Sequence, residues 1–220
     1  MSGKLDIYIG CMFSGKSTEL QRHARRLDVI NAPYTIINHS FDKRYGENVQ
    51  STHNKETLNC VSLNNLYDVY NQSELCEKYR NSEYVFIEEA QFFDDLFDFV
   101  VKSVNEDGKN VLIYGLDGDF MQKPFGDILR LIPYADNVHK LKSFCKMCNN
   151  GEEGLFTIRI NNESTDQVLV GNQNIYTTVC RKHLLQNKNN DLNKDLNKDL
   201  NEDLNENENM YVSAGAMSLK

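Results

Sequence analysis

Two adjacent glutamates, Glu88 and Glu89, end an apolar run at residues 84–87. Two like charges beside a buried strand are costly unless a cation lies close to them. Residues 10–17 read GCMFSGKS and fit the pattern Gly-x-x-x-x-Gly-Lys-Ser. In such a loop the backbone N–H groups surround a polyphosphate, the lysine reaches the outer phosphates, and the serine hydroxyl binds Mg²⁺. The pattern predicts a nucleoside triphosphate site formed by Gly10, Cys11, Met12, Phe13, Ser14, Gly15, Lys16 and Ser17.

The two glutamates have a role at such a site. The carboxyl ends of parallel strands lie beside the phosphate-binding loop, so a carboxylate there can approach Mg²⁺. Successive strand residues point to opposite faces, and Glu88 and Glu89 therefore cannot share one task. We expect one to face the metal and the other to face a cavity that holds an acceptor hydroxyl. From the residues alone the assignment stays open, and a pair of solvated acids is the alternative.

A second group of chemically active residues lies towards the end of the chain. Residues 145–148 read CKMC and residues 180–183 read CRKH. Each pair can present two ligands from one tight turn, and four nitrogen and sulfur ligands complete a tetrahedral zinc site. Because no position stays open for a catalytic water, the sequence predicts a structural Zn²⁺. Its ligands would be Cys145, Cys148, Cys180 and His183.

The elements that position these residues alternate between strand and helix patterns over the first 145 residues. This alternation predicts an α/β fold, with a parallel sheet and flanking helices. A polar stretch without periodicity is expected to be a long loop at 41–60. The apolar spacing predicts strands at 5–10, 34–40, 84–89 and 109–116, and helices within 14–30, 63–79 and 92–104.

The pattern changes at Cys145. Short alternating segments at 155–160 and 167–180 predict a small zinc-binding β subdomain, so we expect domains at 1–144 and 145–186. Residues 187–220 contain a four-residue repeat of Asn, Asp and Leu. Because Asn and Asp are poor helix formers, we favour a disordered tail over a weak helix.

Charge and composition exclude several classes of protein. The net charge is −8, half of it from residues 187–208, and residues 149–179 hold no basic cluster. A surface that binds nucleic acid is therefore not expected. No apolar stretch approaches the length that spans a bilayer, and the first ten residues lack a signal-peptide layout. We expect a cytoplasmic protein that binds neither nucleic acid nor membrane.

With these motifs in this order, the chain resembles the cellular-type (type II, zinc-containing) thymidine kinases from about Lys4 to His183. The resemblance implies transfer of the ATP γ-phosphate to the 5′-hydroxyl of thymidine, with deoxyuridine as a further candidate acceptor, in nucleotide salvage for DNA synthesis. It also implies a P-loop (RecA-like) fold for the parallel sheet and a homotetramer that thymidine triphosphate inhibits. It rests on MFSGKSTEL (12–20), DKRY (42–45), EEAQFF (88–93), LDGDFMQKPFG (116–126) and VGNQNIY (170–176) ahead of CRKH.

The resemblance also implies roles for single residues. Glu89 matches the general base, and Glu88 matches the acid that assists Mg²⁺. Lys16 and Arg44 would stabilise the transferred phosphoryl group, with Asp42 and Gln91 beside ATP and Mg²⁺. Nucleoside contacts are implied for Met12, Phe92, Leu116, Phe120 and Thr157, and for a lasso formed by Gln167, Val168, Leu169, Val170, Gly171 and Tyr176.

Two other functions stay open. A P-loop regulator or ATPase could use the zinc-binding segment to grip nucleic acid, although the acidic charge argues against it. A nucleotide sensor could bind without turnover, because Glu88 and Ala90 replace the family's usual aspartate and glycine. Transfer of phosphate to a nucleoside separates the three functions.

Overall fold

The computed structural model describes residues 2–41, 49–51, 57–160 and 175–189. Its main element is a six-stranded sheet, formed by β1 (Lys4–Gly10), β2 (Tyr34–His39), β5 (Val61–Leu63), β6 (Tyr84–Glu88), β7 (Asn110–Gly115) and β8 (Asn137–Leu141). The strand order is β5-β2-β6-β7-β1-β8, and every neighbouring pair is parallel. The predicted α/β class and parallel sheet are confirmed.

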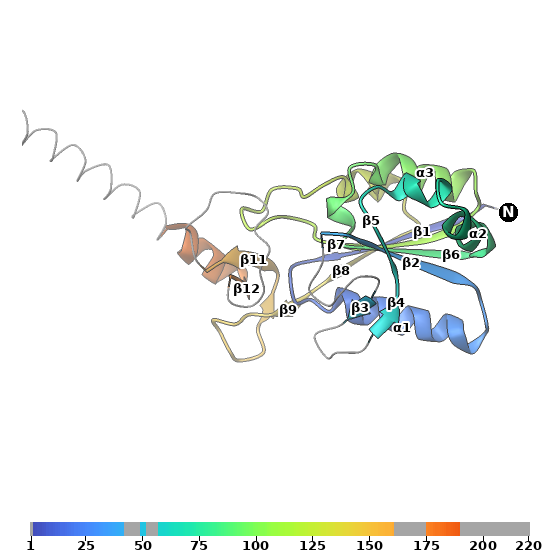
Figure 1. Ribbon diagram of the computed structural model, residues 1–220. Helices are drawn as coiled ribbons and strands as arrows, with labels where there is room; N and C mark the ends of the chain where they lie inside the picture. The colour runs from blue at the N-terminus through green and yellow to red at the C-terminus, as the bar shows by residue number, and fades with distance from the viewer. Residues whose placement is uncertain (1, 42–48, 52–56, 161–174, 190–220) are drawn as a thin grey trace, which may run out of the picture. The chain divides into compact units, whose positions relative to one another are not determined.

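Helices cover both faces of this sheet (Figure 1). The helix α1 (Lys16–Val29) lies on one face, and α2 (Ser73–Asn81) and α3 (Leu96–Asn105) lie on the other. Alternate strand residues supply the two cores, because side chains along a strand point to opposite faces. Ile7, Ile37, Val85, Ile87 and Ile113 belong to the core under α2 and α3, and Tyr8, Ile36, Phe86, Leu112 and Tyr114 pack with Leu20 of α1.

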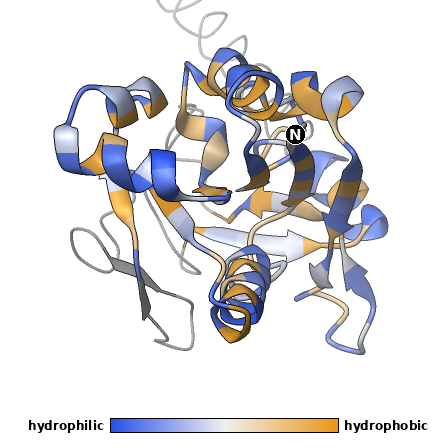
Figure 2. Ribbon diagram, turned by 90° about the vertical axis from the view of Figure 1, so that its right-hand side faces the viewer, coloured by the Kyte–Doolittle hydropathy of each residue, from blue (hydrophilic) through white to orange (hydrophobic). Residues whose placement is uncertain are grey.

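The helices are amphipathic, with polar and apolar sides (Figure 2). Strands buried on both faces read as continuous apolar runs, which explains why β1, β2, β6 and β7 could be predicted from the sequence. By contrast, β8 is an exposed edge strand. Its polar sequence, NVHKL, gave no strand signal, and the 3₁₀ helix before it (Ile128–Tyr134) was also not expected.

Three expected elements differ from the structure. The predicted loop at 41–60 contains an antiparallel pair, β3 (Val49–Ser51) and β4 (Thr57–Asn59). The single helix predicted at 63–79 is wrong, because the segment splits into the end of β5, a 3₁₀ helix (Leu66–Tyr70) and α2. The helix predicted at 92–104 begins only at Leu96, after a short 3₁₀ turn at Ala90–Phe92.

Short antiparallel pairs follow the sheet, as the sequence predicts for the region after residue 144. Strand β9 (Ser143–Phe144) pairs with β10 (Glu153–Gly154), and β11 (Phe156–Arg159) pairs with β12 (Tyr176–Val179). The chain divides into two compact units, residues 1–180 and 181–220, and residues 181–189 of the second form a helix. The predicted domain boundaries after residues 144 and 186 stay a prediction.

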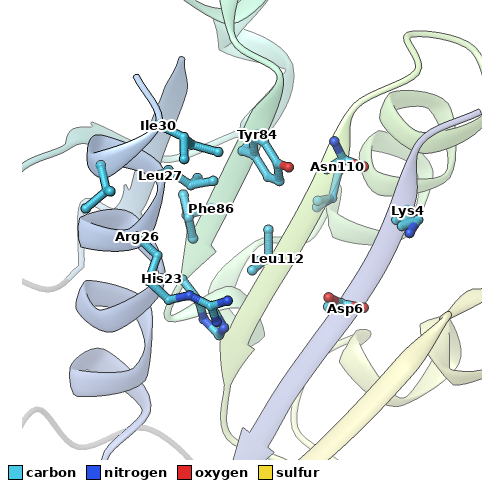
Figure 3. A pocket seen from close by; sticks show the side chains of 12 residues that line it. Lys4, Asp6, His23, Arg26, Leu27, Ile30, Tyr84, Phe86, Asn110 and Leu112 are labelled. Atoms are coloured by element: carbon cyan, nitrogen blue, oxygen red, sulfur yellow. The ribbon is translucent and has the colours of Figure 1, made fainter. Parts of the chain in front are cut away.

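A pocket of about 810 Å³ lies between the C-terminal half of α1 and the sheet (Figure 3). On the helix side, its lining includes Leu27 in the last turn of α1 and Ile30 just after the helix. On the sheet side, it includes the first residues of β6, β7 and β1, which are Tyr84, Asn110 and Lys4. These positions lie at the amino ends of the strands. The predicted phosphate loop follows the carboxyl end of β1, so this pocket is not the predicted nucleotide site.

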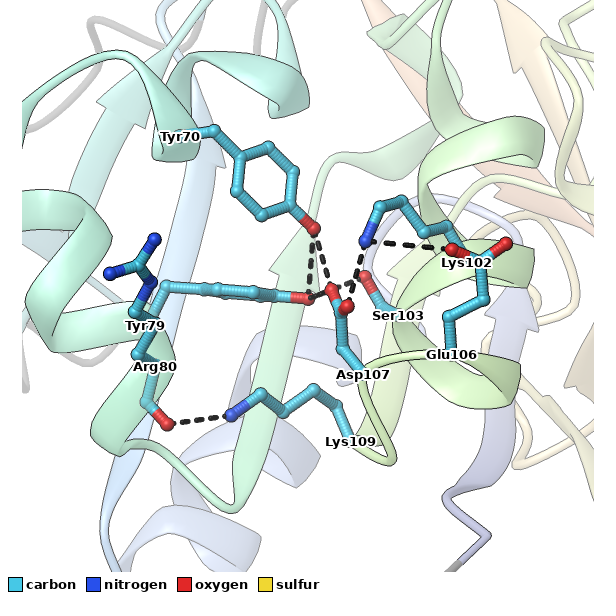
Figure 4. Close-up of polar contacts among 8 residues, drawn as sticks. All are labelled: Tyr70, Tyr79, Arg80, Lys102, Ser103, Glu106, Asp107 and Lys109. Atoms are coloured by element: carbon cyan, nitrogen blue, oxygen red, sulfur yellow. Dashed lines mark hydrogen bonds and ion pairs between the residues drawn. The ribbon is translucent and has the colours of Figure 1, made fainter.

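A polar network joins the 3₁₀ helix at Leu66–Tyr70, α2 and the end of α3 (Figure 4). One carboxylate oxygen of Asp107 accepts hydrogen bonds from the hydroxyls of Tyr70 (2.7 Å) and Tyr79 (2.8 Å). The other accepts one from Lys102 Nζ at 2.7 Å. Burial raises the pKa of Asp107, but these three donors outweigh it and hold the pKa below its usual value. The network therefore favours the ionised carboxylate in the folded protein.

We expect Asp107→Asn to lower the free energy of unfolding at pH 7 by about 1–3 kcal/mol, because a charge-assisted set of hydrogen bonds is lost. The stabilisation is complete above the carboxyl pKa of the unfolded chain and disappears as the pH falls through the lower folded-state pKa. Urea unfolding of wild type and variant should therefore converge in acid. Glu106→Gln is the control, because Glu106 is 70% exposed. Equal stability of Asp107→Asn and wild type at pH 7 would contradict this account.

Candidate active site

The loop at residues 10–17 connects the carboxyl end of β1 to the first turn of α1. A Cβ atom on Gly10 would lie 2.4 Å from the carbonyl oxygen of Leu141, so only glycine fits there. Gly15 has a φ of 86° and precedes the first residue of α1. This left-handed conformation favours glycine, and the helix N-terminus that follows it is the kind of position at which backbone N–H groups bind an anion. The local geometry is that of a strand, a tight loop and a helix N-terminus.

Lys16 points its ammonium group back into this loop. Its Nζ donates hydrogen bonds to the carbonyl oxygens of Gly10 (3.2 Å) and Cys11 (2.9 Å). Although part of the side chain is exposed, the ammonium is enclosed by protein atoms, and this burial lowers the pKa of Lys16. Glu89 is the main group that acts in the opposite direction. An enclosed ammonium at a helix N-terminus fits a polyphosphate, whose negative charge would favour its protonated form.

The adjacent glutamates have different partners. Glu88, the last residue of β6, is 5% exposed, and its Oε1 accepts a short hydrogen bond from the Ser17 hydroxyl. Glu89 follows with a φ of 49°, a strained value for a residue other than glycine. Its Oε2 accepts a hydrogen bond of 2.6 Å from Gln91 Nε2. Ser17 and Glu88 together offer the oxygen ligands that Mg²⁺ prefers.

Gln91 connects Glu89 to the next strand. While its Nε2 binds the Glu89 carboxylate, its Oε1 accepts a hydrogen bond of 3.0 Å from the backbone N–H of Leu116, just after β7. Gln91 is 4% exposed, so both contacts are shielded from solvent. Gln91, which is predicted to lie beside ATP, thus holds the Glu89 carboxylate next to Leu116, which is predicted to contact the nucleoside.

The phosphate loop also contacts β11 and β10. The backbone N–H of Met12 donates a hydrogen bond of 2.9 Å to Thr157 Oγ1, and the Cys11 thiol contacts the carbonyl oxygen of Gly154 at 3.3 Å. Two residues expected to line the nucleoside pocket, Met12 and Thr157, are therefore in direct contact. A third, Phe92, lies in an aromatic cluster with Phe41 (ring centres 5.6 Å apart).

Phe120 and Tyr176 come together through Arg159, which the sequence analysis did not single out. The Arg159 guanidinium carbon lies 3.9 Å from the centre of the Phe120 ring, and Arg159 Nη2 donates a hydrogen bond of 3.0 Å to the Tyr176 hydroxyl. An isolated arginine in a strand carries no motif, so no pattern could have found it. The remaining predicted site residues lie outside the described residues: Asp42, Arg44, Gln167, Val168, Leu169, Val170 and Gly171.

The predicted zinc ligands converge. One ligand atom from each of Cys145, Cys148, Cys180 and His183 lies within 4.8 Å of the other three. Cys148 Sγ and Cys180 Sγ are 3.8 Å apart. Two sulfur atoms bound tetrahedrally to zinc, each at about 2.3 Å, would also be separated by about 3.8 Å. The cluster therefore has the residue types and spacing that fit Zn²⁺.

The electrostatics of these thiols also fit a cation. Burial raises the pKa of Cys145, but backbone N–H groups of Cys180, Cys148 and Met147 outweigh it and lower the pKa to about 6. Partial burial and the two neighbouring sulfur atoms raise the pKa of Cys148 to about 12. One thiolate forms readily, while a second one beside it needs positive charge. A divalent cation would supply that charge.

Comparison with known proteins decides the family. A family model described as thymidine kinase matches residues 3–184. The chain belongs to the thymidine kinase family. This membership makes the protein a kinase, a transferase that uses a nucleoside triphosphate as donor.

In the part of the chain that the structure describes, no helix combines the length and apolar character needed to cross a membrane.

Curated relatives agree with this assignment. "Thymidine kinase a" of Arabidopsis thaliana is 37% identical over 84% of this chain and 76% of the relative. "Thymidine kinase" of Oryza sativa subsp. japonica is 37% identical over 83% and 66%, respectively. "Thymidine kinase" of vaccinia virus (strain Ankara) is 38% identical over 82% of this chain and 96% of the viral protein. The family resemblance inferred from the motifs is confirmed.

Proposed function

We propose that the protein transfers the γ-phosphoryl group of ATP to the 5′-hydroxyl of thymidine. The observation that carries this proposal is the position of Glu89. On one side, its negative charge acts to raise the pKa of Lys16. On the other side, it accepts a hydrogen bond from Gln91, which in turn accepts one from the N–H of Leu116. A carboxylate between a phosphate loop and a nucleoside pocket can activate a hydroxyl that attacks the γ-phosphorus.

On the donor side, the backbone N–H groups of residues 10–17 and the Lys16 ammonium bind the ATP phosphates. Ser17 and Glu88 would hold Mg²⁺, which neutralises charge on the β- and γ-phosphates when bound. Asp42 and Arg44 would complete the donor site, with Arg44 stabilising charge on the transferred group.

On the acceptor side, Glu89 accepts the proton of the nucleoside 5′-hydroxyl. The 5′-oxygen forms a bond to the γ-phosphorus while the bond to the β–γ bridging oxygen breaks, and ADP leaves with thymidine monophosphate as the product. Because phosphoryl transfer depends mainly on positioning and charge stabilisation, a weak carboxylate base is sufficient. Phe120 would stack on the base, and Tyr176 with residues 167–171 would close over the nucleoside.

Transfer of labelled γ-phosphate from ATP to a panel of deoxynucleosides tests the proposal. We expect labelled thymidine monophosphate as the main product, a weaker product from deoxyuridine, and no product without Mg²⁺. RNA and DNA serve as controls, because the alternative ATPase would respond to them. No thymidine product together with DNA-stimulated ATP hydrolysis would support the ATPase, and binding without any transfer would support the sensor.

Family membership supports further properties, which are part of the proposal. These are a homotetrameric state, inhibition by thymidine triphosphate, a structural zinc in each chain, a cytoplasmic location and a role in deoxynucleotide salvage. The domain division after residues 144 and 186 belongs to the same proposal. Sedimentation of the purified protein tests the first property, thymidine phosphorylation measured with and without thymidine triphosphate tests the second, and a zinc measurement on the same sample tests the third.

A further inference from the structure

Arg159 is a buried cation that contacts two residues assigned to the predicted nucleoside pocket. It lies in β11 and is only 3% exposed, although arginine is always charged and is seldom fully buried. Its guanidinium carbon lies 3.9 Å from the centre of the Phe120 ring and 5.4 Å from that of Tyr176. Its Nη2 also donates a hydrogen bond to the Tyr176 hydroxyl. One cation thus contacts both aromatic residues.

We propose that Arg159 is a positioning residue that sets the orientation of Phe120 and Tyr176 for nucleoside binding. The inference rests on the proposed function, because it assigns these two rings to the acceptor site. Arg159 itself need not touch the nucleoside. It acts through the two rings that it contacts.

The contact with Phe120 leaves one ring face for a ligand. The guanidinium lies over one face of the ring, and Phe120 as a whole is only partly buried. A base can therefore stack only on the other face. The backbone beside Phe120 is fixed separately, because Asp119 Oδ1 accepts hydrogen bonds from the N–H groups of Met121 (2.8 Å) and Lys123 (2.9 Å). Asp119 thus fixes the backbone conformation of residues 119–123, and Arg159 fixes the orientation of the Phe120 ring.

The β11–β12 hairpin relates this ring to the phosphate loop. Arg159 pairs directly with Tyr176 across the hairpin, so their side chains share one face. Thr157 lies two residues earlier in β11 and therefore points to the same side. Its hydroxyl accepts the hydrogen bond from Met12 N. Strand β11 therefore contacts both the phosphate loop, through Thr157, and the ring proposed to stack on the base, through Arg159.

Substitution of Arg159 tests this role. We expect Arg159→Gln to raise the KM for thymidine about tenfold and to weaken thymidine binding in calorimetry by a similar factor. The KM for ATP and kcat should stay within about twofold. Arg159→Lys keeps the charge but loses the planar fork, so it should rescue only part of the affinity. Tyr176→Phe, which keeps the ring and loses the hydrogen-bonding hydroxyl, should give a smaller rise in KM.

Arg130→Gln is the matched control, because Arg130 also lies over an aromatic ring, that of Phe97 at 4.5 Å, but is largely exposed. It should leave the thymidine KM unchanged. Zinc content and melting temperature identify any variant that fails to fold. If Arg159→Gln fails to fold, Arg159→Lys and Tyr176→Phe carry the test.

Two results would overturn the inference. One is an unchanged thymidine KM and affinity in folded Arg159 variants. The other is an equal rise in the KM values for thymidine and ATP, which would indicate a general structural role. Failure of the proposed function looks different, because the wild-type protein itself would then transfer no phosphate to thymidine. If the wild-type protein bound thymidine without turnover, the affinities of the variants would still decide the role of Arg159.

Discussion

Glu89→Gln is expected to lower kcat for thymidine phosphorylation by a factor of about 10²–10⁴, the usual contribution of a general base. The amide keeps the size of the carboxylate but cannot accept the proton of the 5′-hydroxyl. The contact with Gln91 Nε2 would change, because that donor would face an amide, but the site would remain filled. Thymidine binding should therefore stay within a few-fold of wild type. Steady-state kinetics and calorimetry on the same protein measure both quantities.

Glu88→Gln is the matched control, because it makes the same chemical change one residue earlier. Glu88 contacts the Ser17 hydroxyl at the end of β6, so its loss should raise the Mg²⁺ concentration needed for half-maximal activity. Excess Mg²⁺ should restore part of the rate in Glu88→Gln and none in Glu89→Gln. If Glu89→Gln kept its rate while Glu88→Gln lost it irrespective of Mg²⁺, the two roles would be reversed.

Removal of zinc is expected to raise the KM for thymidine at least tenfold before the α/β core unfolds. Cys180 directly follows β12, and Lys146 N donates a hydrogen bond of 3.0 Å to Thr178 O in that strand. Breaking the metal cross-link would loosen the hairpin that carries Thr157 and Tyr176. The parallel sheet has its own cores and should remain folded. Kinetics and far-UV circular dichroism, followed during titration with a strong chelator, measure the two effects.

Cys148→Ser should reproduce the effect of the chelator and lower the zinc content of the purified protein. Cys76→Ser is the control, because Cys76 is a buried cysteine of α2 outside the ligand cluster. It should retain zinc and the wild-type KM. An unchanged thymidine KM in protein shown to be free of zinc would refute the link between the metal and the nucleoside site.

The sequence predicted the elements whose side chains obey strong local rules. Strands such as β6 are buried on both faces and read as apolar runs, and the glycines at positions 10 and 15 meet backbone demands that few residues satisfy. The convergence of Cys145, Cys148, Cys180 and His183 could be predicted because two short pairs of potential ligands define a candidate zinc site whatever the intervening chain does. In each case the sequence pattern that supports the prediction is formed by a few neighbouring residues.

What the sequence could not predict depends on contacts between distant segments. Among the described residues, the edge strand β8 pairs with β1 alone and is mostly exposed, so its polar residues show no alternation. The role proposed for Arg159 depends on its contact with Phe120, which is nearly forty residues away in the sequence and lies under its guanidinium. Gln91 was expected beside ATP, but its bridge from Glu89 to Leu116 depends on how β6 and β7 end. Such relations appear only in three dimensions.

The central claim is that Glu89 receives the proton of the nucleoside 5′-hydroxyl while Glu88 serves the metal. A crystal structure of the protein with thymidine, Mg²⁺ and a non-hydrolysable ATP analogue tests it most directly. We predict the 5′-oxygen within about 3 Å of a Glu89 carboxylate oxygen, with Glu88 directed at Mg²⁺ or its bound water. A 5′-oxygen hydrogen-bonded to Glu88, or a nucleoside bound away from both carboxylates, would contradict the account.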